Sequence, residues 1–343
     1  MKVAIIIPTM GRADFIERTL AYYDSLNCPH PIYIGDASGT EISTRINDLA
    51  KRYSNVVVRY FHWERLGISQ TIVKLAEIAQ TECQYCAFHG DDDYFVPASL
   101  SRCAEFLSIS PDYRTAQGRA ALFTLDRPGP YGEIQSLGDY WGVNFLEQNS
   151  PIDRFASFDM NYFVTQFSTH RTEEFVQDSR YYLETNNNNF SELLHCFTFA
   201  IRGKSKFLDC LYLIRSFHEG VYHPSSFMDM VLEDNWVSDY HKTVNALGLA
   251  LSESSNLPLD NARKIVTDAL KLRHERWVLS KCVDRKVGVF SRIKRSLPAP
   301  LKNYLRQLTT DRHDMRLLGS KKSFFYQDFL PVLNSISDKF NRK

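Results

Sequence analysis

Long hydrophobic runs are absent from this chain of 343 residues. No apolar stretch approaches the roughly 20 residues that a helix needs to span a lipid bilayer, so the sequence predicts no membrane-spanning helix. The apolar run at the N-terminus, Met1–Pro8, is too short for a secretory signal peptide and is typical of a strand instead. We therefore expect a cytoplasmic protein.

A large net charge is also missing. The 41 basic and 40 acidic residues leave a net charge of +1, so the composition gives no signal for a nucleic-acid partner. Cysteine is sparse, and the 7 cysteines form an odd set with irregular spacing, which favours reduced thiols over a disulfide framework. Cys83 and Cys86 have C-x-x-C spacing, but without a second pair we do not expect a zinc or redox site.

Strand and helix patterns alternate over the first hundred residues. Val3–Pro8 is a continuous, largely β-branched run, typical of a strand buried on both faces of a parallel sheet. Residues 12–26 follow with apolar side chains at helical spacing. The same alternation predicts strands at 32–34, 56–61 and 85–89 and helices at 42–53 and 69–79. Repeated units of this kind indicate an α/β fold with a mainly parallel, Rossmann-like sheet and right-handed crossovers.

The predicted secondary structure changes near residue 223, from mixed strands and helices to helices. Before this point the patterns predict a helix at 97–107, a strand at 114–125, a long loop over 126–150, a strand at 161–168, a helix from 173, a helix at 190–201 and a strand at 211–214. After it, helical periodicity covers 227–251 and 262–283. We therefore predict an α/β domain over residues 1–223 and a helical C-terminal region over 224–343.

Polar residues collect where the predicted strands end. Pro8 and Thr9 end the first strand, Asp36 ends the second, and Asp91–Asp93 follow the fourth. In parallel sheets, ligands bind at the carboxyl ends of the strands. Three adjacent carboxylates repel one another and are costly to desolvate, and a divalent cation beside a polyphosphate removes that conflict. The alternative is a solvated loop in which Asp93 caps the following helix.

These motifs, in this order, resemble a known family. Val3–Thr9, Asp36–Ser38 and Asp91–Asp93 with Pro97 are similar to nucleotide-sugar glycosyltransferases of the GT-A fold, in particular the inverting family 2. Residues 112–118 and Arg12 resemble a bacterial subgroup from surface-polysaccharide gene clusters. The resemblance covers residues 1 to about 220 and is strongest in the first 120.

The resemblance implies transfer of a sugar from a nucleotide-diphosphate donor to a glycan or lipid-linked acceptor, with Mn²⁺ or Mg²⁺ as cofactor. Asp36 would recognise the nucleotide base, although an Asx-turn at the strand end is the alternative. Asp91 would face the sugar-nucleotide, and Asp92 would ligate the metal, with Asp93 as a further candidate ligand. Gly90 departs from the family pattern, because many relatives have an acid there.

The remaining donor-side candidates lie in loops at the same edge. Pro8, Thr9 and Arg12 would contribute to donor binding. Arg65 precedes Gly67 in a strand-to-helix loop, where it could pair with a phosphate or form a surface salt bridge.

Inversion requires a general base that deprotonates the acceptor hydroxyl. By resemblance this base is a carboxylate near the start of a helix, which suits Glu192, with Asp159 as the reserve candidate. Acidic residues favour helix starts in any case, so a capping role for Glu192 stays open. His218, after the last predicted strand, is a candidate for a metal or phosphate contact.

Two other functions were compared with glycosyl transfer. A nucleotidyltransferase shares the parallel sheet and acidic metal site but normally has a glycine-rich phosphate loop after the first strand, whereas Thr9–Arg12 contains one glycine. A non-catalytic sugar-nucleotide-binding scaffold would not need the intact triple Asp. In the C-terminal region, residues 285–306 interleave basic and apolar side chains, which suits peripheral contact with the inner face of a membrane or packing on the catalytic domain. The sequence does not indicate an oligomeric state.

Overall fold

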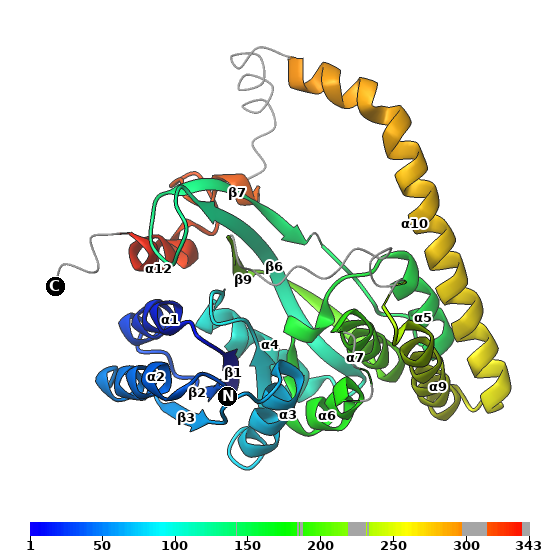
Figure 1. The fold of residues 1–343 in the computed structure, drawn as a ribbon, viewed down its shortest axis with the longest axis horizontal. Coiled ribbons are helices and arrows are strands. Elements are labelled where there is room, and N and C mark those ends of the chain that lie inside the picture. The colour runs from blue at the N-terminus through cyan, green and yellow to red at the C-terminus, as the bar shows by residue number, and fades with distance from the viewer. Residues whose placement is uncertain are drawn as a thin grey trace.

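The structure is a computed structural model that describes residues 1–141, 143–183, 185, 188–218, 231, 233–296 and 314–337. Within these ranges the backbone forms one 9-stranded sheet with helices packed against it. A second group of helices lies beside the sheet, and the long helix α10 (Leu259–Ser296) runs along the outside of the molecule (Figure 1).

The N-terminal half of the sheet is parallel. β1 (Val3–Thr9) pairs with β2 (Ile32–Asp36) on one side and with β4 (Tyr85–Phe88) on the other, and β3 (Val58–His62) lies beyond β2. Strands β1, β2 and β4 are buried along their whole length, as their continuous apolar runs predict. The strand order reverses between β1 and β4. In open α/β sheets, ligands bind beside such a reversal, at the carboxyl ends of the strands.

Helices cover both faces of this parallel half. α1 (Ala13–Ser25) and α2 (Thr40–Arg52) lie on one side of β1, and α3 (Ile68–Ala79), which leads back to β4, lies on the other (Figure 1). Right-handed crossovers require this arrangement, because the chain moves outward from β1 to β3 and then returns.

The second half of the sheet has mixed directions. The short strand β8 (Thr169–Arg171) pairs antiparallel with both β4 and β6 (Tyr113–Leu125), and β6 runs parallel to β9 (Lys204–Phe217). At the margins, β5 (Tyr94–Phe95) pairs with β9, and β7 (Ile134–Trp141) pairs with β6. Because β5 directly follows the triple Asp, its pairing with β9 brings the end of β9 to the end of β4.

The apolar side chains form two hydrophobic clusters. One lies between the sheet and its helices, including α4 (Pro97–Ile109). The other joins helices from both parts of the chain, α5 (Pro151–Met160), α7 (Asn188–Arg202), α9 (Trp236–Ser255) and α10 (Leu259–Ser296). The C-terminal helix α12 (Tyr326–Ile336) joins the first cluster through buried Phe329 and Val332. Residues after 224 therefore contribute to both clusters.

The predicted α/β architecture with C-terminal helices is confirmed, whereas several segments after residue 125 differ from prediction. The predicted loop 126–150 contains β7, which forms by pairing with β6 and packs Ile134, Leu137 and Tyr140 against the first hydrophobic cluster. The predicted strand 161–168 is wrong: it contains a 3₁₀ turn, Thr165–Phe167, and the strand follows as β8. Helix α6 (Thr172–Ser179) begins as expected.

Two helices were missed by the sequence patterns. Helix α5 begins at Pro151, and the side chain of Ser150 accepts a hydrogen bond from the backbone N–H of Asp153, which is a cap that the sequence analysis overlooked. Helix α12 contains an internal proline, Pro331, a residue that disfavours helix interiors.

The structure describes only part of the C-terminal basic segment, residues 285–306. The backbone of α10 extends to Ser296, but the side chains of the basic segment 285–306 lie outside the described residues. No helix in the described ranges is both long and apolar enough to cross a membrane.

Candidate functional site

Side chains link the carboxyl ends of β1 and β4. Thr9 Oγ1, at the end of β1, donates a hydrogen bond of 2.6 Å to Asp91 Oδ2. Thr19 Oγ1, on α1, donates one of 2.8 Å to the backbone carbonyl of Asp91. Pro8 is buried within β1, opposite Gly35 of β2. The structure thus brings Thr9 and Asp91 together although they lie 82 residues apart in sequence.

Arg12 contacts both of the first two carboxylates. Its Nη1 lies 2.7 Å from Asp91 Oδ1, and its Nη2 lies 2.9 Å from Asp92 Oδ2. Gly11 precedes it with φ of 75°, a conformation that favours glycine, and donates its backbone N–H to Ser38 Oγ at 2.8 Å. The Arg12 side chain is 28% exposed, so the cation that offsets the Asp91–Asp92 repulsion is also accessible to a ligand.

Asp92 is surrounded by cationic and polar groups. His218 Nε2 lies 2.9 Å from Asp92 Oδ2 and 2.7 Å from Arg12 Nη2, so the three atoms form a compact triangle. The His218 ring stacks on Phe15 of α1 with 4.8 Å between ring centroids. The fully buried guanidinium of Arg18 donates to the backbone carbonyl of Asp92. These contacts hold both the carboxylate and the backbone of Asp92 in place.

Asp93 faces a different set of partners. Its Oδ2 accepts a hydrogen bond of 2.9 Å from Arg215 Nε, and its Oδ1 accepts one of 3.0 Å from the backbone N–H of Ser216. Arg215 also donates to the hydroxyl of Tyr140 at 2.7 Å and packs over the ring of Phe167. Asp93 is fully buried, so it serves to anchor the end of β9 rather than to cap α4.

The three carboxylates differ in their affinity for protons. Burial, reinforced by the charge of Asp92, raises the pKa of Asp91. Burial alone would also raise the pKa of Asp92, but the hydrogen bond with His218 and the charge of Arg12 outweigh it and lower the pKa. Burial raises the pKa of Asp93 despite the opposing charge of Arg215. Asp92 therefore keeps its negative charge most readily, as a metal ligand must.

A divalent ion fits the donors around Asp92. A carboxylate oxygen of Asp92 and an imidazole nitrogen of His218 converge there. Gly90 has no side chain and so leaves this position open, whereas a Cβ on residue 90 would lie only 2.7 Å from Asp92 Oδ1. Among the described residues, no three Asp, Glu, His or Cys side chains are grouped as a metal site. Two protein donors suit Mg²⁺ or Mn²⁺, which retain positions for water and substrate phosphates. Asp93 does not join this set, because both of its oxygens accept hydrogen bonds elsewhere.

Asp36 is engaged on both oxygens. Oδ1 accepts the backbone N–H of Ser38 at 2.8 Å, which is the Asx-turn that the sequence left open. Oδ2 accepts the hydroxyl of Tyr60 at 2.9 Å, and the whole residue is buried. This geometry favours a structural role in shaping the loop after β2.

Arg65 lies near the same loop but does not enter the carboxylate group. Its backbone N–H donates to the carbonyl of Ala37, and its φ of 61° is left-handed. The side chain is 89% exposed and lies 3.7 Å from Glu64, which corresponds to the predicted surface salt bridge.

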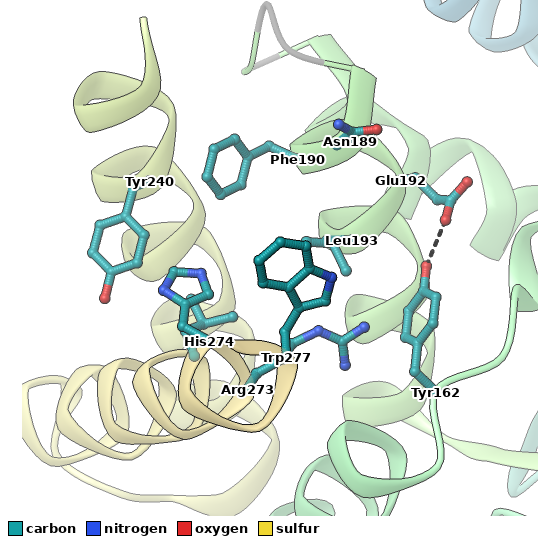
Figure 2. Close-up of a pocket in the computed structure, with 10 residues that line it drawn as sticks. Tyr162, Asn189, Phe190, Glu192, Leu193, Tyr240, Arg273, His274 and Trp277 are labelled. Carbon is teal, nitrogen blue, oxygen red and sulfur yellow. Dashed lines mark hydrogen bonds between the residues drawn. The ribbon is translucent and has the colours of Figure 1, made fainter. Parts of the chain in front are cut away.

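Glu192 lies in the second turn of α7 and lines a cavity between α7 and the C-terminal helices (Figure 2). Its Oε1 accepts the hydroxyl of Tyr162 at 2.8 Å, and its Oε2 accepts Nε2 of Gln166 at 3.3 Å. Burial raises the pKa of Glu192, although Tyr162, Arg215 and Arg273 oppose the change. Its carboxylate contacts side chains of another segment rather than the helix terminus, which argues against the capping alternative.

Asp159, the reserve candidate, is buried at the end of α5. Its carboxylate pairs with Arg273 and Arg276 of α10. This ion pair connects α5 to α10, and Asp159 does not line the cavity.

Two arginines at the site were not singled out as functional from the sequence. Arg18 interrupts the apolar face of α1, and a charged residue at a core position was the signal that could have revealed it. Arg215 lies just beyond the predicted strand 211–214, and only the pairing of β9 with β5 directs it toward Asp93.

No protein-family model matches the chain, and a search of curated protein sequences finds no match. Among solved structures, a crystal structure of S. aureus TarS residues 1–349 is similar at 15% identity and a TM-score of 0.48, covering 80% of this chain and 72% of that one. The mannosyltransferase PcManGT from Pyrobaculum calidifontis, in complex with GDP-Man and Mn²⁺, is similar at 11% identity and a TM-score of 0.41, covering 99% and 88%. GalNAc-T7 with UDP, GalNAc and Mn²⁺ is similar at 13% identity and 0.45, covering 78% and 54%. At these identities and TM-scores, the likenesses show neither the activity nor the donor of this chain.

Proposed function

We propose that this chain is a metal-dependent, inverting glycosyltransferase of the GT-A type that transfers a sugar from a nucleotide-diphosphate donor to a glycan or lipid-linked acceptor in surface-polysaccharide assembly. The observation that carries the proposal is the paired Asp91–Asp92 site at the carboxyl ends of β1 and β4, bridged by Arg12. Two carboxylates and an accessible guanidinium at the carboxyl ends of neighbouring parallel strands together suit a metal-bound diphosphate.

We assign donor binding to the residues at the end of β1. Arg12 would exchange its carboxylate contacts for the donor phosphates, which a guanidinium binds with similar geometry. Thr9 and Thr19 hold Asp91 in a fixed orientation toward the sugar-nucleotide. The partial exposure of Arg12 supports this exchange.

Asp92 and His218 would hold the Mn²⁺ or Mg²⁺ ion. When bound, the ion stabilises the negative charge that develops on the departing nucleoside diphosphate. Arg18 fixes the backbone of Asp92, and Asp93 anchors β9 so that His218, which follows it, reaches Asp92. We leave Asp93 out of the ligand set.

Glu192 would accept the proton of the acceptor hydroxyl. A buried carboxylate with a raised pKa is a stronger base than an exposed one, which suits this role. Tyr162 and Gln166 orient the carboxylate through hydrogen bonds. We do not assign Asp159 to this step, because its carboxylate pairs with Arg273 and Arg276 and does not line the cavity.

The test is a screen of the purified chain for hydrolysis of UDP-, GDP- and dTDP-sugars with and without Mn²⁺. We expect release of a nucleoside diphosphate from at least one donor, and we expect EDTA to abolish it. The control variant Asp112→Asn changes an exposed carboxylate, paired with Lys204, and should behave as wild type. Absence of donor binding, or activity that is unchanged in excess EDTA, would overturn the proposal.

A further inference from the structure

The C-terminal helices α9 and α10 line a half-open cavity together with α7. Its volume is about 220 Å³, and its walls come from α7, α9, α10 and the segment at Tyr162 (Figure 2). At about 30 Å³ for each water in the liquid, this space equals about seven waters. It is smaller than the roughly 300–1,000 Å³ of sites for drug-sized ligands, so it suits one small ring rather than a chain of several.

The walls of the cavity combine aromatic faces with a few polar groups. Phe190, Tyr240 and Trp277 supply rings from three different helices, and Figure 2 shows the indole of Trp277 at the centre of the group. Arg273 and Glu192 supply one positive and one negative charge on the side toward Tyr162. Apolar walls with a small number of polar groups at one side both hold and orient a ligand.

The cavity adjoins the proposed reaction site through Glu192. The Glu192 carboxylate lies at the wall, hydrogen-bonded to Tyr162, and the charge of Arg215 acts on it from the sheet. Arg215 in turn donates to Asp93, next to the proposed metal ligand Asp92. A molecule in the cavity would therefore lie next to the proposed base, Glu192, between it and helices α9 and α10.

We infer that this cavity is the subsite for one pyranose ring of the acceptor, stacked against Trp277 with a hydroxyl directed toward Glu192. The inference rests on the proposed function and deepens it by naming the acceptor as a sugar. A pyranose has one face of C–H groups, which pack on the electron-rich faces of aromatic rings, and hydroxyls around its edge, which bond to charged side chains. A hydrocarbon chain would leave Arg273 and Glu192 without polar contact to the ligand, so it fits these walls less well.

Binding is tested on the full-length chain with methyl glycosides of glucose, galactose, mannose and N-acetylglucosamine, by saturation-transfer difference NMR. We expect at least one glycoside to bind, with the strongest signals on the C–H protons of one ring face. Trp277→Leu keeps an apolar side chain but removes the aromatic face, so its affinity for that glycoside should fall roughly tenfold. Trp63→Leu is the matched control, because Trp63 stacks on Phe61 of β3, and its affinity should equal that of wild type.

A second variant guards against misfolding. If thermal unfolding shows that Trp277→Leu is not folded, Tyr240→Leu changes the opposite wall on α9 and should weaken binding in the same way. Glycoside binding that is unchanged in the folded variants overturns the subsite. A signal from n-octanol as strong as that from the glycosides also overturns it, because the site would then be simply apolar.

Donor hydrolysis separates this inference from the proposed function. Trp277→Leu should retain Mn²⁺-dependent donor hydrolysis, since the cavity does not include Asp91, Asp92 or Arg12. Intact donor hydrolysis without any glycoside binding would contradict the subsite alone. Glycoside binding that depends on Trp277, without donor hydrolysis in wild type, would support a sugar site and contradict the proposed function.

Discussion

Asp92, at the β1–β4 edge, and Glu192, in the cavity, are both buried acids, but their pKa values are shifted in opposite directions. At the β1–β4 edge, buried carboxylates face arginines, and Arg12 with His218 lowers the pKa of Asp92 against the effect of burial. In the cavity, Glu192 accepts hydrogen bonds from a hydroxyl and an amide, and burial raises its pKa although the charges of Arg215 and Arg273 oppose the change. Buried acids in one molecule thus acquire different chemistry from their surroundings. Asp92 is suited to hold a cation, and Glu192 is suited to accept a proton.

The largest effect is expected from a substitution of Asp92, the proposed metal ligand. Asp92→Asn removes the charge that should ligate the ion, so transfer should fall about 10³-fold or more while the fold is kept. The measurement is transfer rate against Mn²⁺ concentration, with thermal unfolding as the check on structure. Full Mn²⁺-dependent turnover by this variant would show that Asp92 is not a ligand.

The next largest effect is expected from a substitution of Arg215, which pairs with Asp93 and whose charge acts on Glu192. Arg215→Met leaves Asp93 buried without its cation, so the free energy of unfolding should decrease by about 3 kcal/mol in urea titrations. The double variant Arg215→Met with Asp93→Asn removes both charges and should recover part of that loss. Equal stability of the single and double variants would mean that the Arg215–Asp93 pair does not stabilise the protein.

A smaller effect is expected at the base. Glu192→Gln keeps the hydrogen bond from Tyr162 but removes the proton acceptor, so the transfer rate should fall roughly 10²-fold with little change in donor affinity. Glu174→Gln, which changes a carboxylate paired with Arg114 outside the site, is the control. Near-normal transfer by Glu192→Gln would assign the proton to another group.

The smallest effect is a shift in pH dependence. The folded-state pKa of Glu192 is raised, so its contribution to stability is present at low pH and is lost as pH rises through that pKa, whereas its activity as a base appears over the same interval. Tyr162→Phe removes a hydrogen bond that lowers the pKa of Glu192, so the acid limb of the pH–rate profile should move to higher pH. A limb that stays in place would indicate that Glu192 does not control it.

Sequence patterns predicted the parallel half of the sheet well, because its apolar runs and helical spacing can be read without knowing which distant segments pack together. β1, β2 and β4 are continuous apolar runs, and the helices between them carry regular apolar spacing, so their boundaries lie close to prediction. The second half depends on partners. β7 forms against β6. The Thr165–Phe167 turn replaces a predicted strand, and its three side chains are buried without sheet pairing.

Sequence patterns alone place acidic and polar residues at the carboxyl ends of buried parallel strands. Which acid does what was decided only by the tertiary structure. The turn from Gly90 to Asp93 directs Asp92 toward Arg12 and His218 but Asp93 toward Arg215, and these partners lie 80, 126 and 122 residues away along the chain. Likewise Trp277 and Glu192 line one cavity although they come from different helices. Periodicity reports which face of an element is buried, whereas the charge of a buried group depends on contacts that form only when distant elements pack together.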